Sequence, residues 1–342
     1  MALFNMPEFN YSGKLYVVRR GRKTGIFNTW EECKKQVLNF SGADYKSFTT
    51  MEEAKAYLNI PINKEKDYTS RDVVNIVGKR IGTRKIGHTG TLDPMACGVL
   101  VLCVGKGLKV VDLITSYNKE YIAKVRLGIL TDTLDITGNV IDTKSVNVSK
   151  NDIVNVLNSF LGKSIQEVPK YSAVKVNGKK LYEYARNNID IELPKRDIEI
   201  YDIELLGDVD YINNYVEFSF RVSVSKGTYI RSLIRDIGNK LGTYGCMIEL
   251  VRTKQGNFLI KDSYTLDDIE NNNYKLLNIR DILDIEKVVV DGDLLKKIQN
   301  GAVVDKFFDS DMALILDKFD NEIGIYQIYD KDNKKVKPYK IF

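Results

Sequence analysis

A short segment between Lys85 and Gly98 constrains the fold more than any other part of the chain. It contains three glycines, two threonines, one aspartate, one proline and the only histidine, His88, among 342 residues. Glycine can adopt positive φ or let another backbone approach closely. A residue before proline avoids the helical region, so Asp93-Pro94 predicts a turn. The segment therefore predicts a rigid loop, rather than a buried strand or a regular helix, that presents Asp93.

The apolar run Val99–Val104 follows this loop directly and has the length of a buried strand. Such a strand would anchor the loop in a core. A carboxylate on a stiff loop beside a buried strand is a common way to present a catalytic group. The alternative is that Asp93 only stabilises an Asx turn before Pro94.

Helical and strand patterns alternate along the chain without a regular βαβ period. Thr69–Asp72 resembles a capping box before a helix that ends at Gly82. Ser149 predicts the start of a second helix, and Thr49 or Thr50 that of a third, which runs to Leu58. Val216–Val224 alternates apolar and polar residues, which predicts a half-buried strand. This mixture favours an α+β fold, with mixed, largely antiparallel strands and flanking helices. The segment from about Ile285 to Phe342 predicts a small β-rich module.

Composition excludes several other classes of site. The four cysteines form no CxxC pair, which argues against a zinc site and a disulfide framework and fits a reducing cytoplasm. No apolar run approaches the ~18 residues of a membrane span, and the N-terminus lacks signal-peptide features. A single histidine excludes a His-rich metal site. What remains is one presented aspartate, with basic loops and tyrosines that could stack on an extruded base.

Five motifs follow one another along the chain. The central one is Gly87–Pro94 with Ala96 and Gly98. The other four are Asn63-Lys64 with Tyr68–Ser70; Lys119–Tyr121 with Leu127-Gly128, Thr131–Thr133, Asp135, Thr137 and Gly138; Pro169–Lys175 with Gly178, Tyr182 and Ala185-Arg186; and Ser225–Arg231 followed by Leu250 and Arg252. In this order they resemble the motifs of the bacterial tRNA pseudouridine-55 synthases, the TruB family. Together they span most of residues 60–257. The resemblance implies a pseudouridine synthase core that isomerises uridine in the T loop of tRNA, at position 55, without a metal or other cofactor.

The resemblance also implies the role of each matching residue. Asp93 is the catalytic aspartate, Arg231 pairs with it and keeps it ionised, and Tyr229 lies near the reacting sugar or C5. Tyr121 stacks on the flipped uracil. Substrate binding is assigned to Leu250 as an apolar wall, to His88, which enters the RNA loop, and to Lys64. Without the family, Tyr121 and Leu250 would be read as core residues, and Arg231 as an ordinary helix charge.

Two positions depart from the family pattern. Glu65 replaces a proline after Lys64, which predicts a looser loop there, and Cys97 replaces a small residue such as threonine. Neither change removes the central carboxylate, so activity is expected to survive.

The first block of the chain is basic and aromatic. Its segments Tyr16–Phe27, Thr29–Cys33 and Tyr45–Phe48 resemble the N-terminal hybrid-binding domain of ribonuclease H, which a plant-virus protein family shares. The resemblance assigns nucleic-acid contacts to Trp30, Tyr45 and Lys46, although Ser47 replaces a second lysine. The plainer alternative is that Trp30, the only tryptophan, belongs to the core of this small domain.

Asn300–Val303 resembles part of the truncated PUA-like domain that follows the core in many of these synthases. The resemblances together imply three domains: a hybrid- or duplex-binding domain over 1–59, a catalytic domain over 60–276 with a thumb loop at about 168–192, and a truncated PUA-like domain over 277–342. The expected partners are tRNA and, through the first domain, duplex RNA or an RNA/DNA hybrid. The protein is expected to be a cytoplasmic monomer that contacts no membrane. The resemblance to the thumb loop, which the guide-RNA-dependent archaeal and eukaryotic relatives lack, implies stand-alone action on tRNA. A non-catalytic RNA-binding or tRNA-folding protein, or a synthase for another RNA, remains the alternative.

Overall fold

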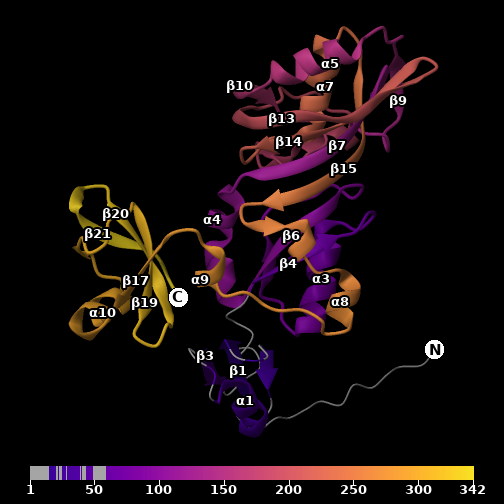
Figure 1. The fold of residues 1–342 in the computed structure, drawn as a ribbon. Helices are drawn as coiled ribbons and strands as arrows, with labels where there is room; N and C mark the ends of the chain where they lie inside the picture. The colour runs from indigo at the N-terminus through magenta and orange to yellow at the C-terminus, as the bar shows by residue number, and fades with distance from the viewer. Residues whose placement is uncertain are drawn as a thin grey trace.

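The computed structural model describes residues 15–20, 22, 25–27, 29–38, 40, 44–48 and 59–342. Within these ranges the largest part of the chain is built on a nine-stranded sheet (Figure 1). Its strands run in the order β10-β13-β14-β7-β15-β6-β4, with β16 paired to β15 and β5 to β6. The strands are β4 (Asn59–Lys64), β5 (Ile86–His88), β6 (Cys97–Val104), β7 (Lys119–Leu127), β10 (Gly162–Glu167), β13 (Lys195–Ile212), β14 (Tyr215–Val224), β15 (Gly245–Gln255) and β16 (Phe258–Leu259).

All pairings in this sheet are antiparallel except one. β6 runs parallel to β15, with Gly98 opposite Arg252. The α+β class with a largely antiparallel sheet, predicted from the alternation of patterns, is therefore confirmed.

Helices and small hairpins surround the sheet. The helices are α3 (Ser70–Ile81), α4 (Val111–Ser116), α5 (Lys150–Asn158), α6 (Leu181–Arg186), α7 (Ile230–Lys240), α8 (Leu266–Glu270) and α9 (Ile279–Ile282), with 3-10 turns at Gly105–Val110 and Ile260–Asp262. The strands β8 (Ile129–Thr131) and β9 (Val140–Thr143) form one hairpin, and β11 (Lys175–Val176) and β12 (Lys179–Lys180) form another inside the predicted thumb loop. None of the helices in the described ranges is both long and apolar enough to cross a membrane.

The predicted start signals of two helices, and the end signal of one of them, are present. Thr69 caps α3 through reciprocal hydrogen bonds with Asp72, and Gly82 ends it with a φ of 78°. Ser149 caps α5 in the same way with Asp152. A helix predicted to start at Thr49 or Thr50 lies outside the described residues.

The apolar run after the Asp93 loop is buried because both faces of β6 are covered. Leu100 and Leu102 point into the main core, which α3, α5 and α7 share with the sheet. Val99 and Val101 point to the other side, into a cluster with α4, α9 and the C-terminal domain. A strand buried on both faces reads as a continuous apolar run rather than an alternating one.

The C-terminal domain is a five-stranded sheet in the order β17-β19-β20-β21-β18. Its elements are β17 (Glu286–Val290), α10 (Gly292–Gln299), β18 (Val304–Asp305), β19 (Met312–Asp317), β20 (Glu322–Tyr329) and β21 (Asp332–Ile341). The small β-rich module predicted from the sequence is thus present.

The N-terminal block forms a separate three-stranded sheet in the order β2-β1-β3 with one helix. Its elements are β1 (Leu15–Arg20), β2 (Gly25–Phe27), α1 (Trp30–Val37) and β3 (Asp44–Phe48). Val18, Cys33 and Val37 form its small core. Trp30 is 38% exposed and packs against Tyr16 with ring centroids 5.6 Å apart, so it is not a core residue.

Candidate active site

The loop that carries Asp93 runs from Thr89 to Ala96, between β5 and β6. Part of the segment predicted as loop, Ile86–His88, is instead strand β5, because it pairs with β6. Buried contacts fix the rest. Ser70 Oγ accepts a hydrogen bond from Leu92 N at 2.9 Å and donates one to Leu92 O at 3.2 Å. Lys64 Nζ donates to Pro94 O at 3.1 Å. The loop is therefore held at both its helix side and its strand side.

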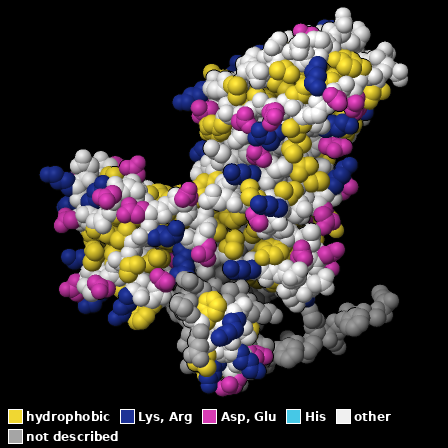
Figure 2. Space-filling model, in the orientation of Figure 1, with side chains coloured by type: hydrophobic (Ala, Val, Ile, Leu, Met, Phe, Trp, Pro, Cys, Tyr) yellow, Lys and Arg dark blue, Asp and Glu magenta, His cyan; other side chains and the backbone are white. Residues whose placement is uncertain are grey.

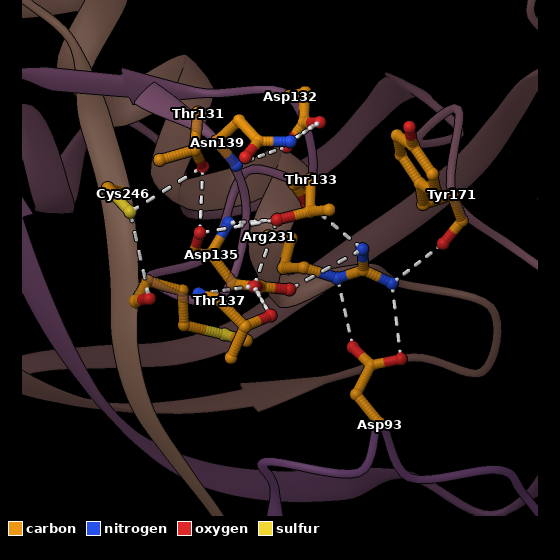
Figure 3. A network of polar contacts seen from close by, with 11 residues as sticks. Asp93, Thr131, Asp132, Thr133, Asp135, Thr137, Asn139, Tyr171, Arg231 and Cys246 are labelled. Atoms are coloured by element: carbon orange, nitrogen blue, oxygen red, sulfur yellow. Dashed lines mark hydrogen bonds and ion pairs between the residues drawn. The ribbon is translucent and has the colours of Figure 1, made fainter. Parts of the chain in front are cut away.

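Asp93 faces Arg231 in the first turn of α7, as Figure 3 shows. Arg231 Nε lies 2.9 Å from Asp93 Oδ2, and Arg231 Nη2 donates to Asp93 Oδ1 at 3.1 Å. The Arg231 side chain is 7% exposed, whereas that of Asp93 is 35% exposed. A planar guanidinium that binds both carboxylate oxygens fixes the orientation of the carboxylate as well as its charge. The exposed part of Asp93 opens into a pocket.

A second aspartate, Asp135, approaches Arg231 from the other side. Its Oδ2 lies 3.8 Å from Arg231 Nη1. Its Oδ1 accepts hydrogen bonds from Thr133 Oγ1 at 2.9 Å and from Thr137 N at 3.0 Å. Arg231 also donates to the backbone oxygens of Thr133 and Tyr171 (Figure 3). The guanidinium is thus held on several sides by acceptors from distant parts of the chain.

Opposing effects act on the pKa of the Asp93 carboxyl group. Burial raises the pKa of the Asp93 carboxyl above its ordinary value, and Asp135 adds to this effect, whereas Arg231 and Lys64 oppose it. Desolvation disfavours the charged form of a carboxyl group, and a nearby cation favours it. The sequence resemblance assigned only the second effect, so the net direction of the shift differs from the one expected.

The pocket beside Asp93 has a volume of about 280 Å³. Its lining includes Tyr121 from β7, Leu250 from β15, and Tyr229, which directly precedes α7. The Tyr121 and Leu250 side chains are nearly buried, 8% and 7% exposed, because β7 pairs with β15 at the centre of the sheet. Aromatic and apolar walls next to one carboxylate suit a planar ring such as a nucleobase.

A buried glutamine fixes the position of Tyr229. Tyr229 N donates to Gln166 Oε1 at 2.8 Å, and Gln166 Nε2 donates to Tyr229 O at 3.1 Å. Burial raises the pKa of the Tyr229 hydroxyl, so this group is protonated at neutral pH. It can therefore donate a hydrogen bond or relay a proton within the pocket.

Three basic side chains lie on the remaining wall of the pocket. Lys119, Lys226 and Arg252 line it, and burial lowers the pKa of Lys119 to about 8. Arg252 is 1% exposed and donates to Val99 O at 2.6 Å and Gly90 O at 3.0 Å. An excess of positive charge around one carboxylate suits a ligand that carries phosphates.

Two residues expected to bind substrate lie outside the pocket lining. His88 is half-buried in β5, directly before the pocket-lining Thr89. Burial, with the charges of Arg252 and Arg71, lowers its pKa, so it is neutral at pH 7. Lys64 is completely buried beneath the Asp93 loop, where it holds Pro94 and Glu65. Its geometry is that of a residue that positions the loop.

The sequence interpretation assigned no role to two residues that the site uses. Asp135 belongs to one of the five family-like motifs, and its repeated Thr-Asp pattern is the signal that could have identified it. Gln166 lies in a β-strand with an otherwise exposed pattern, and no local signal marks it. In the N-terminal block, Tyr45 and Lys46 occupy β3 opposite Val18 and Val17, but their side chains lie outside the described residues.

Three family models match the chain in consecutive ranges. Residues 79–230 match the TruB family pseudouridylate synthase N-terminal domain, and residues 231–290 match the tRNA pseudouridylate synthase B C-terminal domain. Residues 14–58 match the ribonuclease H1 N-terminal domain.

Curated relatives match over most of their length. The tRNA pseudouridine synthase B of Staphylococcus saprophyticus is 41% identical over 302 residues, which cover 83% of this chain and 98% of that protein. Its counterpart in Staphylococcus aureus strain Newman is 40% identical over 301 residues, with the same coverage. Among solved structures, an H/ACA ribonucleoprotein bound to a substrate RNA containing 2′-deoxyuridine superposes with a TM-score of 0.62 at 23% identity, covering 86% of this chain and 87% of that chain. A Cbf5–Nop10–Gar1 complex gives a TM-score of 0.61 at 25% identity, covering 86% and 85%. These structures share the fold.

Proposed function

The chain belongs to the TruB family of pseudouridylate synthases, and on this premise we propose that it converts uridine 55 in the T loop of tRNA to pseudouridine, with Asp93 as the catalytic carboxylate. It is an RNA-modifying isomerase. The relatives carry the name tRNA pseudouridine synthase B, which supports tRNA as the substrate. What we propose beyond the family assignment is the position of the modified uridine within tRNA and the role of each residue.

The reaction rearranges one nucleotide without adding or removing atoms. The bond between N1 of uracil and C1′ breaks, the base turns, and a bond forms between C5 and C1′. The proton on C5 leaves, and N1 ends with a proton. The detached base must stay in place between the two bond changes, so the pocket has to hold it while Asp93 acts at the sugar or the base.

The observation that carries this proposal is the bidentate pair of Asp93 with Arg231 at the edge of a small aromatic pocket. The pair holds one carboxylate at the wall of the space that Tyr121 and Tyr229 also line. The base must leave its stack, which costs a few kcal/mol, and stacking on Tyr121 returns about 1–3 kcal/mol. The Tyr229 hydroxyl is an uncharged group of the pocket lining that could move the C5 proton.

Base-resolution mapping of pseudouridine in tRNA tests this proposal. Unmodified tRNA incubated with the purified protein should gain pseudouridine at position 55 and at no other uridine. Asp93→Asn should form none, while its Kd for tRNA stays within a few-fold of the wild-type value, because the amide keeps the shape of the side chain. Turnover by Asp93→Asn near the wild-type rate would remove Asp93 from its assigned role. Tight binding of tRNA by the wild-type protein without any pseudouridine would instead indicate an RNA-binding or RNA-folding protein.

We further propose that the N-terminal domain binds duplex RNA or an RNA/DNA hybrid. Residues 14–58 match the ribonuclease H1 N-terminal domain, and Trp30 remains exposed beside Tyr16. An exposed aromatic ring suits stacking on a nucleic-acid base or sugar.

A further inference from the structure

A groove outside the catalytic pocket runs along α3 and has no role in the reaction described above. Its volume is about 580 Å³. One wall is the helix face that carries Arg71, Asn75 and Lys79, at spacings of four residues. The other wall is the turn from Thr83 to Ile86, which includes Arg84. Residues four apart lie on the same helix face, so the three α3 side chains form one row.

Close packing at Gly78 shapes the floor of this groove. A Cβ atom at position 78 would lie 2.9 Å from Thr83 O and 3.0 Å from Ile86 Cγ2. Glycine therefore allows the turn to pack directly against the helix. Gly82 N and Thr83 N both donate to Gly78 O at 2.9 Å, which fixes the turn. The groove is a built feature of the fold, not a gap left by mobile side chains.

The cations of the groove carry no counter-charge. Arg71, Lys79 and Arg84 are exposed, and within the described ranges none of them forms an ion pair. Other cations are neutralised: Arg221 pairs with Glu120, Asp202 and Glu204, and Lys124 and Arg126 share Glu217. On the face seen in Figure 2, basic and acidic side chains are interspersed. Three unpaired cations in one groove, with no carboxylate among its lining residues, create a local positive potential.

The groove begins beside the catalytic pocket. Arg71 follows Ser70, whose Oγ exchanges hydrogen bonds of 2.9 and 3.2 Å with the backbone of Leu92, a residue of the pocket lining. From Arg71 the row extends for eight residues of α3, about 12 Å at 1.5 Å per residue. That length matches three to four nucleotides at about 3.4 Å per nucleotide along one strand.

We propose that this groove binds the phosphate backbone of the substrate RNA strand where it leaves the catalytic pocket, outside the target loop. The inference rests on the proposed RNA substrate. Arginine and lysine bind phosphates as charges, and the Asn75 amide can donate to a phosphate oxygen. Such contacts position the RNA without reading its sequence. They set affinity and leave the chemistry at Asp93 unchanged.

The test compares two triple variants of the full-length protein. Arg71→Gln/Lys79→Gln/Arg84→Gln removes the three positive charges from the groove. Lys144→Gln/Lys163→Gln/Lys287→Gln removes the same charge from exposed lysines elsewhere. The Kd for tRNA is measured from about 50 to 300 mM salt, a range over which phosphate contacts change affinity strongly, together with the single-turnover rate at saturating enzyme. Thermal unfolding verifies that both variants fold.

The groove variant should bind tRNA about tenfold or more weakly at about 0.1 M salt, and its log Kd against log salt slope should fall by about 2–3, since each phosphate contact contributes about 0.7–0.9. Its rate at saturation should equal that of the wild type. A short single-stranded oligonucleotide around the target uridine should show little of this penalty, because it lacks the flanking strand.

Equal losses in the two triple variants would overturn the proposal, because net charge alone would then explain them. An equal loss on the short oligonucleotide would also overturn it. Both outcomes leave pseudouridine formation by the wild-type protein intact, so a failure of this inference is distinguishable from a failure of the proposed function.

Discussion

At the scale of single residues, Arg231 is the side chain on which the site depends most. It binds both oxygens of Asp93, faces Asp135 and donates to two backbone oxygens while almost fully buried. Removing one partner of a buried charged pair leaves an uncompensated charge in a poorly solvated place. Its role is therefore structural and electrostatic at the same time.

Arg231→Met should lower both activity and stability. We expect a loss of about 3 kcal/mol in unfolding free energy, at the lower end of the range for broken buried pairs, because Asp93 retains some solvent access. Arg231→Lys should recover most of the stability but little of the activity, because an ammonium cannot bind both carboxylate oxygens in one plane. Denaturant unfolding and single-turnover rates measure the two effects, and an unchanged midpoint in Arg231→Met would show that the pair does not stabilise the fold.

The pKa of Asp93 predicts the pH dependence of the reaction. Since burial and Asp135 raise this pKa, activity that requires the carboxylate should fall on acidification at a pH above about 3.9, the ordinary aspartate value. Asp135→Asn removes one raising influence, so the acid limb of kcat/KM should move to lower pH. Because the pKa of Asp93 is higher in the folded than in the unfolded state, its contribution to the free energy of unfolding is fully present below the unfolded-state pKa. This contribution is lost as the pH rises through the folded-state pKa. An acid limb that does not move in Asp135→Asn would separate Asp135 from the ionisation of Asp93.

At the scale of elements, the parallel pairing of β6 with β15 connects the Asp93 loop to the pocket wall. Gly98 has a φ of 100°, and a Cβ atom there would clash with Arg252 O and lie 2.8 Å from Arg252 N. Both the backbone conformation and the close approach therefore require glycine.

Gly98→Ala should separate the two strands and displace Arg252 from Gly90. Strain at positive φ costs about 1–3 kcal/mol and overpacking about 1–3 kcal/mol more. Gly162→Ala is the matched control, since Gly162 has a φ of 93° and no atom lies within 4 Å of the place a Cβ would take. The difference in unfolding free energy between the two variants isolates the clash, and equal losses would argue against it.

Patterns among residues close in sequence predicted the helices and strands, but they did not predict the contacts between distant segments. Caps at Thr69 and Ser149, the alternation in Val216–Val224 and the apolar run Val99–Val104 each depend on neighbours in sequence, and each element is present. The pairing of Gly98 with Arg252 joins segments that are far apart in the chain, and no local pattern encodes it. The support of Tyr229 by Gln166 is similarly non-local. Ile86–His88 was missed as a strand because its glycine favours a loop until a partner strand is present.

At the scale of the whole molecule, the chain combines a TruB-family catalytic region with an N-terminal domain that matches a different family. The family motifs and the Asp93 pocket lie after residue 60, whereas the ribonuclease H1-type match ends at residue 58. Asn59 is the first residue of β4 and pairs with Cys103 in the catalytic sheet. A truncation should therefore remove residues 1–58 and keep Asn59.

Deleting residues 1–58 should leave pseudouridine formation in free tRNA within a few-fold of the full-length rate, because the catalytic sheet and pocket remain complete. Binding to long duplex RNA or RNA/DNA hybrid should weaken, with a shallower salt dependence, because phosphate contacts release counterions. Trp30→Ala in the full-length chain is the matched control: it should weaken duplex binding while preserving most of the salt slope, since stacking is not a charge effect. Equal duplex affinities and slopes for the full-length and truncated proteins would show that this domain does not bind nucleic acid here. Loss of catalysis with unchanged binding would instead make the domain part of the enzyme's fold.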